Sequence, residues 1–319
     1  MSFHQMIPTH NQSTISEFFL LGFQLQHRSR IILFTTLLLV YIMTLTGNLL
    51  IIILVSATQY LRSPMYFFLS QLSSCDIILT TSIIPNLLRI TLHNGIPMSV
   101  SQCIAQLNFF CFPSVTECLL LTIMSYDRYV AVCKPLHYVT IMNFPFCLSL
   151  VVFSWILGFL LALIVSILLS NLTFCNPKYI DHLFCDLVPL VQLSCSDTTV
   201  LQIVIYLIGV PETVIETVFI ISTYVCIFCA VHRISSTTGR HKAFSTCSSH
   251  LAVVCTYYGT VTAIYIFPSR ESSSGINKIV SLIYTVVTPL LNPVIYSLKN
   301  QEIKTAIKKL LNKKKMLVI

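Results

Sequence analysis

The chain has 319 residues, of which 55% are hydrophobic and only 9% are charged, and its formal net charge is +8. Its mean hydropathy of +0.83 excludes an ordinary soluble domain, whose surface could not carry this much apolar area without aggregating. The positive charge favours contact with a membrane surface, and the sequence offers no basic soluble domain of the kind that binds nucleic acid.

Seven apolar stretches are long enough to cross a bilayer as helices, which takes about 20 residues each. In chain order they cover residues 31–57, 64–90, 103–133, 146–170, 200–232, 243–267 and 276–298. The period-two alternation of membrane β-barrels is missing from these stretches. The predicted fold class is therefore an all-α membrane protein, a bundle of seven transmembrane helices with a short amphipathic helix at its C-terminal end.

The basic residues predict the orientation, because lysine and arginine are most frequent on the cytosolic side of membrane proteins. With an odd number of spans and the N-terminus outside, most of them face the cytosol. The chain then divides into an extracellular tail over 1–30, a membrane domain over 31–298 and a cytosolic segment over 299–319. This last segment places Ile303, Ile307 and Leu310 on one helical face among lysines, which indicates a helix on the anionic inner leaflet and makes membrane lipid an expected partner. A disordered basic tail is the alternative from Asn312 onward.

Sequence features of the outer segments agree with this orientation. Sequons begin at Asn11 and Asn171, and both would be accessible to glycosylation. The longest outer loop, 171–198, carries three cysteines, and a fourth lies at the start of the third apolar stretch; spacing leaves the pairing open. They are Cys103, Cys175, Cys185 and Cys195. The stretch "HLFCD" over 182–186 could hold a metal ion only if a disulfide does not use its thiol, so no metal site is predicted.

Ionisable residues within the apolar stretches should face the bundle interior, because charge in hydrocarbon is costly. A buried polar cluster is predicted from four of the polar side chains: Asn48, Asp76, Glu117 and Asn292. It would either fix helix packing or bind a cation or proton. Glu212 and Glu216 lie one turn apart after Pro211, and either contact with a ligand or hydrogen bonding between helices would explain them.

Motifs along almost the whole chain resemble those of rhodopsin-like G-protein-coupled receptors. The general ones are Gly47-Asn48, Asp76, Asp127-Arg128-Tyr129, Trp155 and "NPVIY" over 292–296. Four longer stretches are similar to odorant receptors in particular: "PMYFFL", "MSYDRYVAVCKPLHY", "KAFSTCSSH" and "PLLNPVIYSLKN". The sixth apolar stretch has "YYG" at 257–259 in place of a tryptophan, and its cytosolic end has Arg240 and Lys242 but no acidic partner for Arg128.

The resemblance implies an odorant receptor of the plasma membrane that binds small volatile organic ligands and activates a stimulatory heterotrimeric G protein, which raises cyclic AMP. It implies disulfides Cys103–Cys185 and Cys175–Cys195, and no cofactor. The residues expected to form the G-protein switch are Asp127, Arg128, Tyr129, Tyr224, Asn292, Pro293 and Tyr296. Helical phase and resemblance place the ligand, uncharged rather than charged, among Phe110, Cys111, Ser114, Ile208, Tyr258, Thr262, Tyr265 and Thr285.

Other function classes compete with this hypothesis. A rhodopsin-like receptor for a non-odorant small molecule or a peptide would share most of the motifs. An ion or proton carrier would use Asp76 and Glu117, but no pore motif or gating repeat supports it. An enzyme is not expected, because no Ser/His/Asp arrangement, zinc-ligand spacing or phosphate loop occurs.

Overall fold

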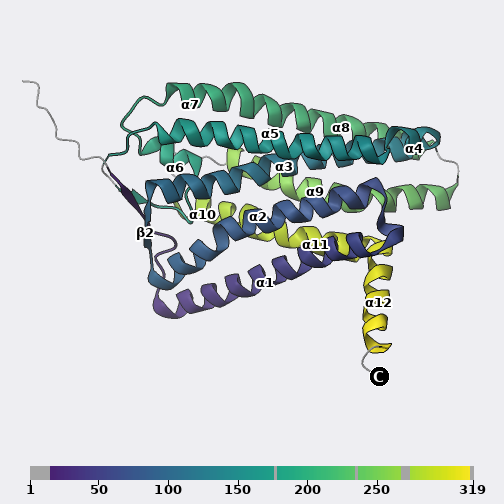
Figure 1. Ribbon diagram of the computed structural model, residues 1–319, viewed down its shortest axis with the longest axis horizontal. Coiled ribbons are helices and arrows are strands. Elements are labelled where there is room, and N and C mark those ends of the chain that lie inside the picture. The colour runs from purple at the N-terminus through teal and green to yellow at the C-terminus, as the bar shows by residue number, and fades with distance from the viewer. Residues whose placement is uncertain (1–14, 176–177, 234–235, 267–273, 317–319) are drawn as a thin grey trace, which may run out of the picture.

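The computed structural model describes residues 15–175, 178–233, 236–266 and 274–316 (Figure 1). Its elements in chain order are β1 (Glu17–Leu20), α1 (His27–Ala57), η1 (Gln59–Leu61), α2 (Pro64–His93), β2 (Ile96–Ser99), α3 (Val100–Cys133), η2 (Pro135–His137), α4 (Tyr138–Ile141), α5 (Phe144–Ser170), β3 (Tyr179–Ile180), α6 (Leu187–Gln192), α7 (Thr199–Val204), η3 (Ile205–Gly209), α8 (Val210–His232), α9 (Thr237–Ile266), α10 (Ser274–Leu282), η4 (Ile283–Val287), α11 (Thr288–Lys299) and α12 (Gln301–Met316).

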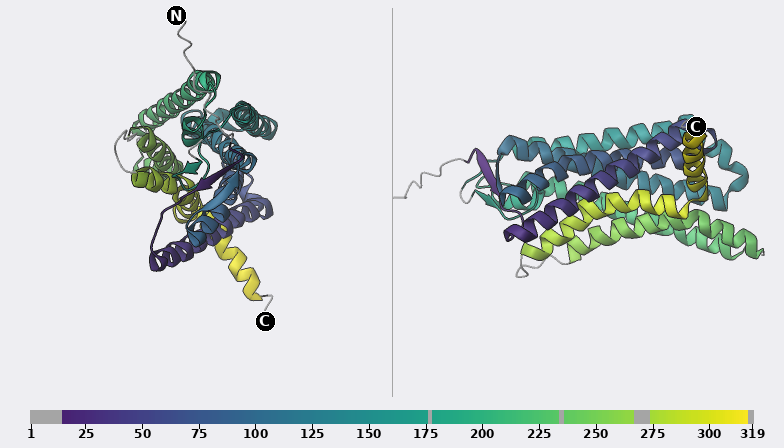
Figure 2. Two further views of the ribbon diagram at one scale, coloured as in Figure 1. Left: turned by 90° about the vertical axis from the view of Figure 1, so that its left-hand side faces the viewer. Right: turned by 90° about the horizontal axis from the view of Figure 1, so that it is seen from below.

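The long helices lie side by side along the longest axis of the molecule, as the three views in Figures 1 and 2 show. Six helical stretches of the described chain are long and apolar enough to cross a membrane, and α9, with 30 residues, completes the bundle. The predicted seven-transmembrane fold is confirmed. α12 leaves one end of the bundle at a steep angle and extends to Met316, so the helix continues past Asn312 (Figure 1).

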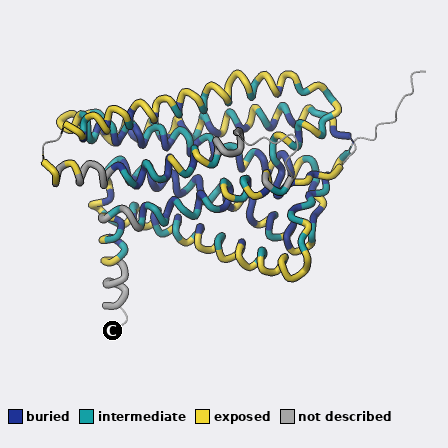
Figure 3. The backbone as a smooth tube through the Cα atoms, turned by 180° about the vertical axis from the view of Figure 1, so that it is seen from behind, coloured by how far each residue is buried: buried dark blue, intermediate teal, exposed yellow. Residues whose placement is uncertain are grey.

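The side chains of the bundle are sorted as a bilayer requires. Exposed positions follow the outer edges of the helices, and buried positions face the middle (Figure 3). Leu39 of α1 is 62% exposed and Phe153 of α5 is 57% exposed, whereas Leu72 and Ile83 of α2 are fully buried. Large exposed apolar residues on the outer helices would promote aggregation in water, but they match lipid tails.

A capping box explains why α3 begins at Val100, before the apolar stretch that starts at 103. The side chain of Ser99 accepts a hydrogen bond from the backbone N–H of Gln102 at 3.2 Å. The Gln102 side chain accepts one from the backbone N–H of Ser99 at 3.1 Å. These polar residues start the helix although hydropathy does not mark them.

Two π-helical segments interrupt the bundle, and both lie immediately before a proline. η3 ends two residues before Pro211, and η4 ends two residues before Pro289. Proline lacks an N–H and its ring crowds the preceding turn, so a wider turn accommodates it. A proline at 211 indicates that the helix can kink there, but it does not indicate a change of helix type.

A small sheet covers the end of the bundle opposite α12; we call the two ends the sheet end and the α12 end. β1 pairs antiparallel with β2, with Glu17 opposite Ser99, and parallel with β3, so the strand order is β2-β1-β3. Phe18 and Leu20 of β1 are buried beneath it. Lys278 of α10 donates to the backbone oxygen of Gly22 at 2.8 Å and pairs with Asp181 at 2.5 Å. The chain before α1 is therefore attached to both the long loop and α10.

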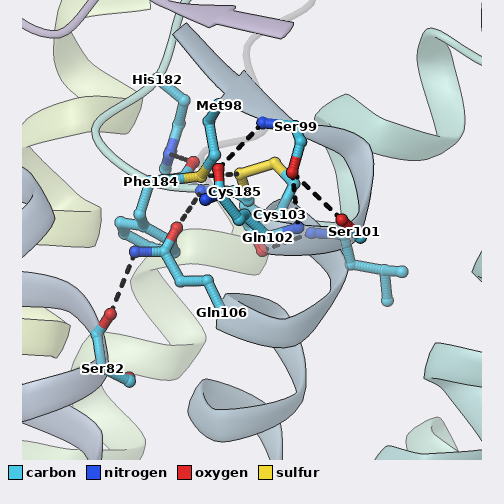
Figure 4. Close-up of a disulfide and its surroundings, with 12 residues drawn as sticks. Ser82, Met98, Ser99, Ser101, Gln102, Cys103, Gln106, His182, Phe184 and Cys185 are labelled. Carbon is cyan, nitrogen blue, oxygen red and sulfur yellow. Dashed lines mark hydrogen bonds between the residues drawn. A yellow bond between two sulfur atoms is a disulfide. The ribbon is translucent and has the colours of Figure 1, made fainter. Parts of the chain in front are cut away.

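Both disulfides that the resemblance implies are present, Cys103–Cys185 and Cys175–Cys195. Figure 4 shows the first one, which joins α3 to the long loop. Beside it, Gln106 accepts from the backbone N–H of Cys185 at 3.0 Å and donates to the backbone oxygen of Ser82 at 3.0 Å (Figure 4). The loop is thus fixed to α3 covalently and, through Gln106, to α2.

Candidate functional site

Aromatic rings form a continuous chain of contacts in the half of the bundle nearer the sheet. Phe184 of the long loop lies against Phe110 of α3, with ring centroids 5.3 Å apart, and Phe110 meets Tyr284 of η4 at 6.0 Å. Tyr284 lies 5.8 Å from Tyr257 of α9, whose ring is 5.3 Å from that of Tyr258. The helices and the loop share an apolar, aromatic interior of the kind that ligand sites use.

Hydroxyl groups connect α9 to the helices on either side of this interior. Tyr257 donates to the backbone oxygen of Ser114 at 3.3 Å, and its hydroxyl lies 2.9 Å from the thiol of Cys118, both on α3. Tyr258 donates instead to a carboxyl oxygen of Glu216 on α8 at 3.4 Å. Adjacent tyrosines therefore couple α9 to both α3 and α8.

The predicted ligand residues differ in how far they are enclosed. Three are buried: Phe110, Ser114 and Thr285. Two are partly exposed: Cys111 and Tyr258. Ile208, on η3, is 40% exposed and is the least enclosed of those whose side chains are described. The side chains of Thr262 and Tyr265 on α9 lie outside the described part of the structure.

Three of the four residues of the predicted polar cluster meet around one amide. Nδ2 of Asn292 donates to both carboxyl oxygens of Asp76 at 3.1 Å and lies 3.3 Å from Oε1 of Glu117. All three side chains are buried. One amide donor thus joins α2, α3 and α11 at the middle of the bundle.

Asn48, the fourth residue, makes different contacts from those expected. Its Nδ2 donates to the backbone oxygens of Thr44 at 3.1 Å and of Pro289 at 3.2 Å. The Pro289 oxygen has no N–H partner four residues on, because that residue is Pro293. Gly47 permits this contact, since a Cβ there would lie 3.1 Å from the Pro293 ring. Asn48 therefore serves a broken helical turn rather than the carboxyl cluster.

At the α12 end, Arg128 is held by its neighbour in sequence. Nε of Arg128 donates to Oδ2 of Asp127 at 2.9 Å, and Nη2 contacts the same oxygen. The other carboxylate oxygen accepts a hydrogen bond from the hydroxyl of Tyr138 on α4 at 2.8 Å. Arg128 is only 8% exposed. Asp127, itself held by Tyr138, thus supplies the acidic partner that the sequence of residues 237–246 at the start of α9 lacks.

His250 of α9 links three helices in the same half of the bundle. Its Nε2 lies 3.2 Å from the backbone oxygen of Leu121 on α3, and its Nδ1 lies 2.6 Å from the hydroxyl of Tyr224 on α8. A carbonyl oxygen only accepts, so Nε2 carries the proton and Nδ1 accepts from Tyr224. The rings of Tyr224 and His250 are also stacked, with an interplanar angle of 9°.

The remaining predicted switch residues surround this region. Tyr129 stacks on Tyr126 with centroids 6.3 Å apart, and Nζ of Lys134 lies 5.8 Å from the Tyr129 ring. Tyr296 is fully buried, and within the described structure its hydroxyl has no hydrogen-bond partner. Pro293 lies against the position of Gly47 described above.

The "HLFCD" stretch does not offer the thiolate that a metal ion would need, because Cys185 is in a disulfide. His182 is instead a structural residue of the loop. One ring nitrogen lies 3.2 Å from the Phe184 backbone oxygen and the other 3.2 Å from the Ser281 hydroxyl. Burial lowers the pKa of His182, an effect that the nearby Asp186 carboxylate opposes.

Sequence reasoning assigned no role to several residues that the structure makes central: Tyr138, His250, Tyr257 and Tyr284. His250 is an ionisable residue within the apolar stretch 243–267, which is a signal that it needs a buried partner. The tyrosines carried no comparable signal, because tyrosine is common at helix ends and in apolar interiors alike.

Comparison with known proteins identifies the family of this chain. A family model described as "Olfactory receptor" matches residues 37–314. Olfactory receptor 11L1 of Homo sapiens is 46% identical over 304 residues, which cover 95% of this chain and 94% of that protein. Olfactory receptor 1J1 of Mus musculus is 43% identical over 304 residues, 95% of this chain and 97% of that protein. Olfactory receptor 1468 of Rattus norvegicus is 42% identical over 307 residues, 96% and 98% of the two chains. The chain belongs to the olfactory receptor family of G-protein-coupled receptors, and it is a receptor rather than an enzyme.

Proposed function

We propose that this receptor binds small volatile organic ligands in the aromatic interior near the sheet and activates a stimulatory G protein at the α12 end, which raises cyclic AMP. The observation that supports this most directly is the series of contacts through α9. Tyr257 and Tyr258 touch the proposed ligand interior, and His250 of the same helix touches α3 and α8 nearer to Arg128. A ligand that displaces α9 at one end would change the contacts at the other.

The proposed ligand walls are the predicted residues on α3, η3, α9 and η4: Phe110, Cys111, Ser114, Ile208, Tyr258, Thr262, Tyr265 and Thr285. The proposed switch comprises Asp127, Arg128, Tyr129, Tyr224, Asn292, Pro293 and Tyr296. In the arrangement observed, the carboxylate of Asp127 binds the guanidinium group of Arg128. Activation requires a second arrangement in which Arg128 faces the G protein, and only a ligand with higher affinity for that arrangement shifts the balance.

The proposed setting is the plasma membrane, with residues 1–30 and the sheet end extracellular and residues 299–319 cytosolic. Asn171, the C-cap residue of α5, is then on the extracellular side, where glycosylated residues lie. Asn11 lies outside the described residues. α12 carries its buried Ile303 and Ala306 toward the bundle and exposes Lys308 and Lys309, which suits contact with anionic lipid of the inner leaflet. The cluster of Asp76, Glu117 and Asn292 either fixes helix packing or binds a cation or proton.

The test is a cyclic AMP assay in cells that express the receptor, with a panel of volatile compounds and surface labelling of the protein. We expect Arg128→Ala to abolish the response while the surface amount stays unchanged, because Arg128 would contact the G protein directly. Arg89→Ala is the matched control: Arg89 is an exposed arginine near the sheet end of α2. A full response from Arg128→Ala at equal surface amount would contradict the proposal.

A further inference from the structure

Two glutamates on the inward side of α8, Glu212 and Glu216, have no partner of opposite charge within the described part of the chain. Glu216 is 5% exposed and begins the buried stripe of α8, which continues through Ile220, Thr223, Ile227 and Val231. Glu212 lies one turn earlier, so its side chain neighbours that of Glu216 on the same helical face. Carboxyl groups in the apolar interior of a membrane bundle are costly and need a reason.

The hydrogen bonds in the structure satisfy these carboxyl groups only in part. One oxygen of Glu216 accepts from Tyr258 at 3.4 Å. Oε1 of Glu216 and Oε1 of Glu212 are both buried and, in the described part of the chain, have no hydrogen-bond partner. The ion pairs recorded among the described residues, Arg128–Asp127 and Lys278–Asp181, involve neither glutamate. Two acceptor oxygens with no partner therefore face the interior from adjacent turns.

Ordinary structural roles do not account for the pair. A glutamate in a first helical turn can stabilise the free N–H groups there, but α8 continues directly from α7 and η3, so Glu212 does not begin a free helix. Hydrogen bonding between helices explains one oxygen of Glu216 through Tyr258, and it leaves Glu212 without a role. Like charges one turn apart also destabilise a helix unless a cation lies between them.

We propose that Glu216 and Glu212 form an ammonium-binding subsite beside the proposed ligand interior, so that the ligands of this receptor are small volatile amines. The inference rests on the proposed function and names its ligand class. An ammonium group has hydrogens to donate to both free oxygens, and the tyrosine ring of Tyr258 beside Glu216 offers a face that attracts cations. The hydrocarbon part of the amine then contacts the apolar and aromatic interior that begins at Tyr257 and Phe110.

A ligand of this receptor must be volatile, as the proposed function requires, and must carry positive charge, as the two carboxyl groups require. Amines satisfy both conditions. The neutral amine is volatile and crosses apolar media, whereas in water near pH 7 an alkylamine is protonated, as a lysine side chain is. Charge-assisted hydrogen bonds to carboxylates are about twice as strong as neutral ones, so the pair discriminates an amine from an alcohol of equal size. The proposed ligand therefore has a cationic head on an apolar body, whereas the sequence predicts an uncharged ligand.

The first test measures binding by the purified full-length receptor in detergent, as the shift of its thermal unfolding midpoint. Linear alkylamines are compared with linear alcohols of the same carbon number. We expect amines to bind at least tenfold more tightly than the matched alcohols. Equal affinity for the two series, or no shift with any amine, would overturn the inference.

Variants then assign the effect to the two carboxyl groups. Glu216→Gln keeps the shape and the hydrogen bond to Tyr258 but removes the charge, and we expect it to weaken amine binding tenfold or more while alcohol binding stays unchanged. Glu212→Gln, at a partly exposed position, should weaken amine binding in the same direction and preserves a test if the first variant does not fold. Glu302→Gln is the matched control, because Glu302 is exposed on α12, at the α12 end of the bundle and far from the two glutamates. Unchanged amine affinity in both pocket variants refutes the subsite.

The cyclic AMP assay separates this inference from the proposed function. Amine binding without any cyclic AMP response would leave the subsite standing and reject the coupling. A cyclic AMP response to alcohols but not to amines would support the coupling and reject the subsite.

Discussion

Tyr138→Phe removes one hydroxyl and should raise the basal activity of the receptor. In the observed arrangement that hydroxyl donates to the buried Asp127 carboxylate at 2.8 Å, and Asp127 in turn holds Arg128. A hydrogen bond to a charged group contributes about 1.5–3 kcal/mol. Because Tyr138 is partly exposed, water can replace part of the lost hydrogen bond, and we expect the variant to lose about 1 kcal/mol of it. Each 1.4 kcal/mol is a factor of ten in an equilibrium constant, so the fraction of receptor with Arg128 released should rise roughly fivefold.

The assay for Tyr138→Phe is cyclic AMP without ligand, normalised to surface receptor. Tyr126→Phe is the matched control: it removes a tyrosine hydroxyl from α3 at the same end of the bundle, and this hydroxyl makes no hydrogen bond among the described residues. Basal signalling should rise in the first variant only, and the ligand concentration for half-maximal response should fall with it. Unchanged or reduced basal signalling at equal surface amounts would show that the Tyr138–Asp127 contact does not restrain Arg128.

Other predictions concern the loop and the packing of the helices. Replacing both Cys175 and Cys195 by serine opens a bridge between residues 20 apart, which should cost about 3 kcal/mol and lower the thermal midpoint of the purified receptor. Gly158→Ala on α5 would place a Cβ 2.9 Å from a backbone oxygen of α3, so surface expression should fall. Gly259→Ala should be tolerated, because a Cβ there would have no neighbour within 4 Å among the described residues. Because burial lowers the pKa of His182, the folded loop favours the neutral ring. The contribution of His182 to the stability of the loop is therefore complete above about pH 6.5 and declines as the pH falls below that value. Proteolysis of the loop should accelerate at low pH, and His182→Gln should abolish this dependence.

The bundle could be predicted from the sequence because the bilayer sets the length of each apolar stretch. The start of α3 could not be found in this way, since Ser99 and Gln102 are polar and act through capping rather than burial. β1 was missed for another reason. Its partners, β2 and β3, are distant in sequence, and a four-residue strand has too little pattern of its own to reveal them.

The polar interior was predictable in its membership but less so in its contacts. Asp76, Glu117 and Asn292 were expected to meet because each must avoid lipid, and they do. Asn48 obeys the same rule but bonds to the backbone of Pro289, a partner that depends on the angle and spacing of α1 against α11. The pairing of His250 with Tyr224 likewise depends on how two helices are rotated about their axes, which periodicity within one helix does not specify.

The small sheet at the end of the bundle also has a consequence for biosynthesis. β1 is the first of the described elements to be made, yet the strands on either side of it come from residues near 97 and near 179. At about 5–20 residues per second, the roughly 160 residues between β1 and β3 take on the order of 8–32 s to synthesise. Until β2 has been made both edges of β1 lack their final partners, and the edge that pairs with β3 lacks its partner for the whole interval. Unpaired strand edges are sites where other chains attach. The nascent receptor is therefore most exposed to misassembly before its long loop has been synthesised. Its yield depends on what protects β1 during that time.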